Sequence, residues 1–466
     1  MRSMRRCWLA HGSKSELLRP RPGSSEMALS NIAPDPRAKV ASGMVPQTTA
    51  TIGLALLYLL FCLQHVVIGT AFEEGQGLSL GSTALRLVAL GATVFFFVRE
   101  RGIASRLRAP FVAIVACLCV LVISTALSDH RPIAVKFAVR YATQLLMLWC
   151  ILNFLLLYPR LRGAVGRALI IALWVGLAVG LGNRYGIDWI SRLSVLFHGS
   201  DALKYMPRII GLYEHPATFG AVAVVVAVMA SQLRTEGAIG KLDLAAAMTG
   251  AAATLILTEA RNPIVPLLML AAAFAVTRRG RQRWLALSAL ALLAGLIAAT
   301  IWFRYEELTS ASRESFATMF SLGRTYIWQG AFDAWTGRPW WGLGPGVFQF
   351  LTPDFTGGRF LRGELHAHNL VLGILSETGM MGFIAMTGLF MTLGWPALSA
   401  RSGKARRRWA LTWLVVLFGL GLFDFYLPFY GFSLHISVAA ALVFCAPASE
   451  PGADHSTAGI TGEAQS

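Results

Sequence analysis

Two histidines, His366 and His368, stand two residues apart where a long polar stretch meets an apolar run, and arginines are spread through the polar stretches before them. A neutral imidazole, with an ordinary pKa of about 6.5, is suited to accept a proton from a hydroxyl group. The long polar segment that ends in this histidine pair is therefore where we expect chemistry. His368 is the first choice of base and His366 the second, and a merely hydrogen-bonded histidine at a helix start is the alternative for each.

A metal site is not expected. Two histidines at positions i and i+2 are poorly placed to bind one metal ion on a helix, and few other ligand-type residues gather near them. The six cysteines, at positions 7, 62, 117, 119, 150 and 445, form neither a zinc spacing nor a disulfide framework in the long polar loops. The sequence predicts no metal and no cofactor.

Arg261 lies in a short turn between two apolar runs. A charge at that depth must be paired, because an unpaired charge within a membrane costs several kcal/mol. Arginine binds phosphate in a bidentate manner, so we favour a phosphate partner. A salt bridge to Glu259 and a side chain that extends to the membrane surface are the alternatives.

The composition indicates that these residues belong to a membrane protein and are positioned by its helices. Hydrophobic residues make up 55% of the 466 residues and charged residues only 14%, which is not the balance of a soluble domain. An all-α polytopic fold is predicted, with about 12 transmembrane helices of roughly 20 residues each. The apolar runs lie near 50–70, 81–98, 110–127, 137–157, 164–182, 215–232, 243–258, 262–277, 284–303, 368–395, 408–426 and 429–446.

Basic residues concentrate in alternate loops, which predicts that these loops and both termini face the cytoplasm. The long loops, about 183–214 and 304–367, then lie outside. In the larger loop, apolar residues recur with helical spacing after Arg324, at 327, 328, 331, 332 and 335, which predicts an amphipathic helix on the membrane face or over the bundle. The glycine-punctuated turn 338–348 predicts close packing of backbone against a helix.

The net charge of +17 could suggest nucleic acid, but the surplus lies in cytoplasmic loops and at the N-terminus, so we expect membrane lipids as partners and no nucleic acid. Residues 1–46 and 447–466 are predicted to be disordered cytoplasmic ends. Between them we expect helices 1–9 over 47–303, the large external loop over 304–367 and helices 10–12 over 368–446.

The motifs resemble those of the bacterial O-antigen ligase and polymerase superfamily. They are an external arginine before a helix, an arginine in a later short turn, Gly-Arg-x-x-x-Trp, Arg-Pro-x-x-Gly-x-Gly and His-x-His-Asn followed by Glu-x-Gly. In this sequence they correspond to Arg208, Arg261, 323–328, 338–344 and 366–379. The resemblance covers roughly residues 50 to 446, and the combination is more specific than any single motif.

The resemblance implies a multi-pass protein of the bacterial inner membrane that acts as an inverting glycosyltransferase, without metal, in lipopolysaccharide biosynthesis. Its active site would face the periplasm, with the large helical periplasmic loop between helices 9 and 10. The donor would be a glycan on undecaprenyl diphosphate, and the acceptor would be a hydroxyl of lipid A core or of another glycan. Arg208 and Arg261 would bind the diphosphate, with Arg324 a further candidate, and His368 or His366 would be the base.

Alternatives remain open. A polymerase of O-antigen or exopolysaccharide would have the same architecture as a ligase. A flippase for lipid-linked glycans would also have about twelve helices, but it would be expected to distribute charge through a central cavity. Intramembrane charges are few in this sequence, chiefly Arg86 and Arg140, which favours the enzyme. A membrane-bound acyltransferase is a further, weaker alternative.

Overall fold

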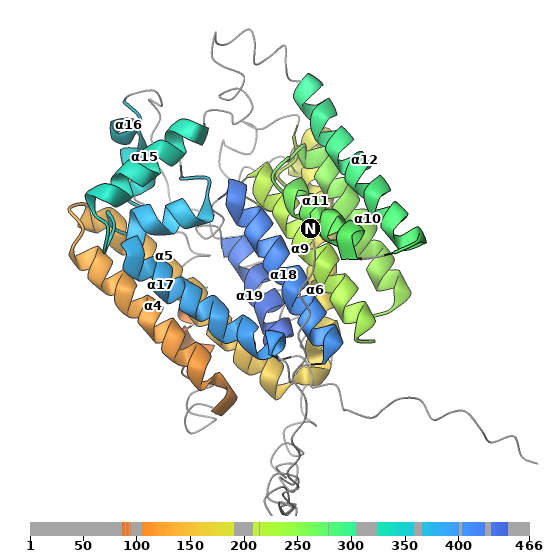
Figure 1. The fold of residues 1–466 in the computed structure, drawn as a ribbon, viewed down its shortest axis with the longest axis horizontal. Coiled ribbons are helices and arrows are strands. Elements are labelled where there is room, and N and C mark those ends of the chain that lie inside the picture. Colours follow the sequence, from red (N-terminus) through yellow and green to blue (C-terminus); the bar gives the residue numbers. More distant parts are fainter. Residues whose placement is uncertain are drawn as a thin grey trace, which may run out of the picture. The chain divides into compact units, whose positions relative to one another are not determined.

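The computed structural model describes residues 86–88, 90–92, 94, 105–190, 208–213, 215–277, 279–303, 324–357, 366–399, 403–424 and 430–445. These residues form helices and contain no β-strand (Figure 1), so the predicted all-α class is confirmed. The chain divides into units Met1–Met44 and Val45–Ser466, and every described residue belongs to the second. The predicted ends 1–46 and 447–466, the first predicted span and most of the second lie outside the described residues.

Each of the remaining ten predicted apolar runs coincides with a helix. These helices are α4 (Arg108–Ala126), α5 (Arg131–Leu157), α6 (Arg162–Arg184), α9 (Pro216–Thr235), α10 (Lys241–Thr258), α11 (Ile264–Thr277), α12 (Arg281–Phe303), α17 (Leu370–Leu398), α18 (Lys404–Phe423) and α19 (Tyr430–Phe444). Six segments in the described part of the chain are long and apolar enough to cross a membrane: α4, α5, Pro159–Arg184, α9, α10 and α17. The number of spans beyond these six stays a prediction.

Helix α9 forms the centre of the core. It packs against α6, α10 and α19, and almost every one of its residues is buried. Alanines and valines make up half of the helix, and the small alanines let neighbouring helices approach it closely. Its start is fixed by His215, whose Nδ1 accepts a hydrogen bond from the Ala217 amide at 3.1 Å, and by Pro216 in the first turn. The core thus holds the N-terminus of α9 in a defined place.

The predicted amphipathic helix after Arg324 is α15 (Arg324–Gly337), and it is followed by the short α16 (Phe348–Phe355). The buried face of α15 differs in part from the predicted one: it consists of Ile327, Gly330, Ala331 and Ala334, whereas Phe332 is exposed. Small residues rather than aromatic ones face inward because α15 packs closely on α16 and α17.

Helix α17 is interrupted at Gly379, whose φ of 67° is not helical. The glycine-rich turn fills the interruption with main-chain hydrogen bonds. The amides of Leu343 and Gly344 donate to the carbonyls of Ser376 and Glu377, each at 2.9 Å, and Met380 donates to Pro339 at 2.8 Å. The predicted packing of this turn against a helix is confirmed.

Candidate active site

His368 and Asp424 form the centre of the candidate site. Nδ1 of His368 lies 3.1 Å from Oδ1 of Asp424, which directly follows the last residue of α18. Burial by itself would raise the pKa of Asp424, but the hydrogen bond with His368 and the charge of Arg324 hold it well below its usual range. Asp424 is therefore an ionised carboxylate that can only accept a hydrogen bond, which places the proton on Nδ1 of His368 and leaves Nε2 available.

The backbone around His368 is held by two other elements. His368 adopts a left-handed conformation with φ 46°, which is uncommon for a residue with a side chain. Its carbonyl oxygen lies 3.4 Å from Nε1 of Trp328 on α15. The next residue, Asn369, caps α17 by accepting from the Leu372 amide at 3.0 Å, and it donates to the Leu422 carbonyl at 3.0 Å. The ends of α17 and α18 are thereby joined beside the imidazole.

A chain of polar contacts connects Arg324 to the same carboxylate. Nη1 of Arg324 donates to Oδ1 of Asn262 at 3.0 Å, and the Asn262 amide donates to Oδ2 of Asp424 at 3.1 Å. Asn262 is buried in the turn between α10 and α11. The two carboxylate oxygens of Asp424 thus have different partners: Oδ1 contacts His368 and Oδ2 contacts Asn262. The guanidinium of Arg324 is connected to this carboxylate through the side chain of Asn262.

Arg208 and His215 lie on the segment that leads into α9. Nε of Arg208 donates to the carbonyl of Thr258, the last residue of α10, at 2.9 Å. Burial lowers the pKa of His215 to about 4; Asp424 opposes this shift, and the charges of Arg208, His368 and Arg324 add to it. Asp424, Arg208, His368 and Arg324 therefore lie near enough to His215 for their charges to act on its protonation.

Arg261 lies in the turn between α10 and α11 and is half-buried. It directly precedes Asn262, and its carbonyl accepts from the Ile264 amide at 3.0 Å. The main chain of Arg261 therefore lies at the edge of the network around Asp424, while its binding of phosphate stays a prediction.

His366 occupies a different environment from His368. Its Nδ1 lies 2.8 Å from Oε1 of buried Gln349, and its ring centroid lies 5.9 Å from that of His368. A neutral amide stabilises a protonated imidazole less than a carboxylate does. His366 is therefore better suited to orient a bound group, and His368 is better suited to take up a proton.

Among the described residues, no group of three or more histidine, cysteine, aspartate or glutamate side chains is arranged to hold a metal ion. That the activity does not depend on a metal ion remains a prediction, which removal of metal by a chelator would test.

Sequence reasoning missed Asp424 and the contributions of Asn262, His215 and Gln349. Asp424 fell at the end of a predicted apolar run, 408–426, and an acidic residue at such a position is a signal for function. Glu377 was named as part of the Glu-x-Gly motif but not counted as an intramembrane charge; it lies inside α17 and accepts a hydrogen bond from the Tyr141 hydroxyl at 2.9 Å. The intramembrane charges are therefore not chiefly Arg86 and Arg140.

Together, the apolar helices and the buried acid and imidazole pair at helix ends define a multi-pass α-helical membrane protein with a polar site. Residues 245–387 match the family model described as O-Antigen ligase. This match supports the O-antigen ligase superfamily that the motifs predicted. The match includes Arg261, Arg324, His366 and His368 but not Arg208 or Asp424. The comparison with curated proteins found no match.

Proposed function

We propose that this protein is a lipid-linked glycosyltransferase that moves a glycan from undecaprenyl diphosphate to a sugar hydroxyl at the periplasmic face of the bacterial inner membrane. The observation that carries the proposal is the 3.1 Å pairing of His368 with Asp424 beside Arg208 and Arg324. A base poised next to cations suits a reaction in which a hydroxyl attacks and an anion departs.

In the proposed reaction, Nε2 of His368 accepts the proton of the acceptor hydroxyl while Asp424 stabilises the imidazolium that forms. The acceptor oxygen forms a bond to the anomeric carbon, and the bond from that carbon to the diphosphate breaks. The lipid diphosphate leaves with the electron pair, and Arg208, Arg261 and Arg324 neutralise its charge. Direct attack inverts the anomeric centre, as the family resemblance implies. No metal takes part.

Within the superfamily we propose an O-antigen ligase that uses lipid A core as the acceptor. Polymerisation of O-antigen or exopolysaccharide repeats is the second candidate, since it uses the same chemistry on a different hydroxyl. Deletion in cells separates the two: loss of a ligase leaves long chains on undecaprenyl diphosphate and bare core, whereas loss of a polymerase leaves core that bears one repeat.

The direct test is transfer by purified protein in detergent, with undecaprenyl-diphosphate-linked glycan as donor, in the presence and absence of lipid A core. Wild type is compared with His368→Ala and His366→Ala. Product that requires core and is lost in His368→Ala supports a ligase with His368 as the base. Lengthening of the lipid-linked glycan without core identifies a polymerase, and the lack of any product would favour a flippase.

A further inference from the structure

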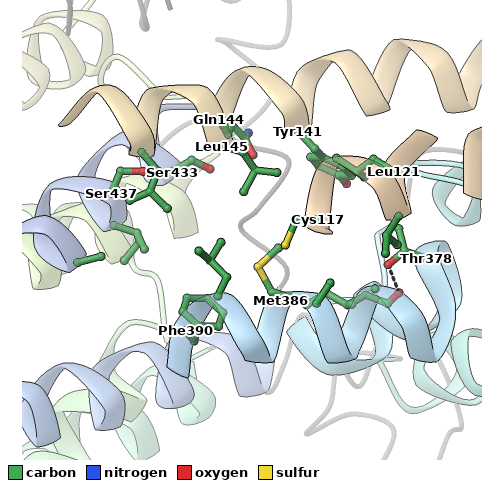
Figure 2. A pocket seen from close by; sticks show the side chains of 18 of the residues that line it. Cys117, Leu121, Tyr141, Gln144, Leu145, Thr378, Met386, Phe390, Ser433 and Ser437 are labelled. Atoms are coloured by element: carbon green, nitrogen blue, oxygen red, sulfur yellow. Dashed lines mark hydrogen bonds between the residues drawn. The ribbon is translucent and has the colours of Figure 1, made fainter. Parts of the chain in front are cut away.

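A mostly apolar cavity lies between α4, α5, α17 and α19, apart from the histidines and arginines of the candidate site. Figure 2 shows Tyr141, Gln144 and Leu145 of α5 facing Met386 and Phe390 of α17 across it. Cys117 and Leu121 of α4 and Ser433 and Ser437 of α19 complete its walls. None of the histidines and arginines named in the proposed chemistry lines this cavity.

Both segments of α17, before and after the interruption at Gly379, contribute to the wall. The lining residues are Ile374, Glu377, Thr378, Gly382, Ala385, Met386, Leu389, Phe390 and Leu393. From Gly382 on they recur every three or four positions, which is the spacing of a single helix face. This part of the wall is about 17 Å long at the rise of an α-helix, so an extended apolar chain can contact it along its length.

The chemistry of the walls fits hydrocarbon and not a charged headgroup. No arginine or lysine belongs to the residues that line the cavity. The carboxyl group of Glu377 is engaged with the Tyr141 hydroxyl at 2.9 Å, and the Thr378 hydroxyl donates to the Ile374 carbonyl at 2.9 Å. Gln144, whose buried Nε2 has no hydrogen-bond partner among the described residues, and Ser433 and Ser437 add polar groups to the wall. The other lining side chains are almost all apolar, so the surface offers mainly burial of apolar groups.

We propose that this cavity binds the polyprenyl chain of the lipid-linked donor, a proposal that rests on the function proposed above. The same helix carries both parts of the required site: α17 begins next to His368, and the cavity wall begins at Ile374, about 8 Å further along its first straight segment. In a polyprenyl diphosphate the chain is attached directly to the diphosphate, so its headgroup site and chain site must be adjacent. In the acceptor, a long sugar headgroup separates the reacting hydroxyl from the acyl chains.

The test compares donors that differ only in chain length. Ala385 lines the cavity, and Ala385→Phe narrows it; its neighbour Ile384 is 55% exposed on the outside of the helix, so Ile384→Phe is the matched control. Loss of burial of about two methylene groups corresponds to about a tenfold weakening. We expect KM for the long-chain donor to rise about tenfold in Ala385→Phe and to be unchanged in Ile384→Phe. For a donor with a short, two-isoprene chain, KM is expected to be the same in all three proteins.

Ala440→Phe narrows the cavity from α19 and serves if Ala385→Phe does not fold. A polyprenyl diphosphate with a photoreactive group on its chain gives a readout without turnover, with labelled peptides expected from α4, α5, α17 or α19 and less labelling in the narrowed variants. Equal KM for long and short donors in the narrowed variants, labelling elsewhere, or a rise in KM for the acceptor alone would overturn the chain assignment. If wild type transfers from neither donor, the proposed function itself fails.

Discussion

Asp424 and His368 are separated by 56 residues of sequence, yet their side chains meet at 3.1 Å where the end of one helix faces the start of another. The acid is buried and ionised and holds the imidazole through Nδ1. The neighbouring residue Asn369 is not available to hold the imidazole in place of Asp424, because its side chain caps α17.

The first prediction concerns this pair. Asp424→Asn keeps the shape of the side chain but removes the charge that stabilises a protonated imidazole, so the rate of transfer is expected to fall by about 10²-fold or more. The control is Asp333→Asn, since Asp333 is an exposed residue of α15 that contacts Gln329. Initial rates with saturating donor and acceptor provide the measurement. A rate for Asp424→Asn within the range of the control would exclude Asp424 as the residue that positions the base.

Arg261 is predicted to bind the diphosphate through two N–H groups of its planar guanidinium. Arg261→Lys keeps the charge and loses the bidentate geometry, so transfer is expected to fall at least about tenfold, with normal insertion in the membrane. Arg167→Lys is the matched control, because Arg167 forms a partly exposed ion pair with Asp243 at 3.2 Å. Activity of Arg261→Lys near that of wild type would remove Arg261 from the site.

His215, which caps the N-terminus of α9, is predicted to make the stability of the protein depend on pH. The pKa of His215 is lowered to about 4, below the ordinary value of about 6.5, so the unfolded chain binds more protons than the folded protein between these values. Stability therefore falls as the pH drops from about 6.5 to 4, by on the order of 3 kcal/mol from this group. Protonation also removes the acceptor for the Ala217 amide.

His215→Asn retains a capping oxygen and does not titrate. Melting temperatures in detergent are expected to decline less steeply from pH 7 to 4.5 in this variant than in wild type. Parallel curves for the two proteins would show that His215 does not supply the pH dependence.

Gly342 is predicted to be indispensable where the turn meets α17. A Cβ at Gly342 would lie 2.5 Å from the carbonyl carbon of Glu377, and φ at Gly342 is 66°. Gly342→Ala is expected to destabilise the protein by about 2 kcal/mol or more. A Cβ at Gly337 meets nothing within 4 Å, so Gly337→Ala should be neutral or stabilising. Thermal unfolding of the two variants distinguishes a required close approach from a general intolerance of alanine.

Removal of divalent metal is predicted to leave transfer unchanged, because the proposed chemistry uses arginine for charge neutralisation and histidine for proton transfer. The measurement is the initial rate before and after treatment with EDTA. Loss of activity on chelation, with recovery on addition of one divalent ion, would refute the metal-free mechanism.

Much of the helical fold could be predicted because apolar length alone marks helices in a membrane protein. The boundaries were less accurate: α5 begins at Arg131, about six residues before the predicted start, because Arg131, Pro132 and Lys136 interrupt the apolar signal there. The interruption at Gly379 was also not predicted, since it depends on the turn that fills it. Of the site, the histidines and arginines could be named from motifs, but Asp424 could not, because its role arises from a contact between distant helix ends.

The interruption of α17 also bears on how the chain enters the membrane. A helix with a break exposes main-chain groups that hydrocarbon cannot satisfy, and here the partners of Ser376, Glu377 and Met380 come from a turn 33 to 41 residues earlier in the sequence. That turn is synthesised first. On the predicted topology it must cross the bilayer before α17 can be buried, so the order of translation matches the order of assembly that this topology requires.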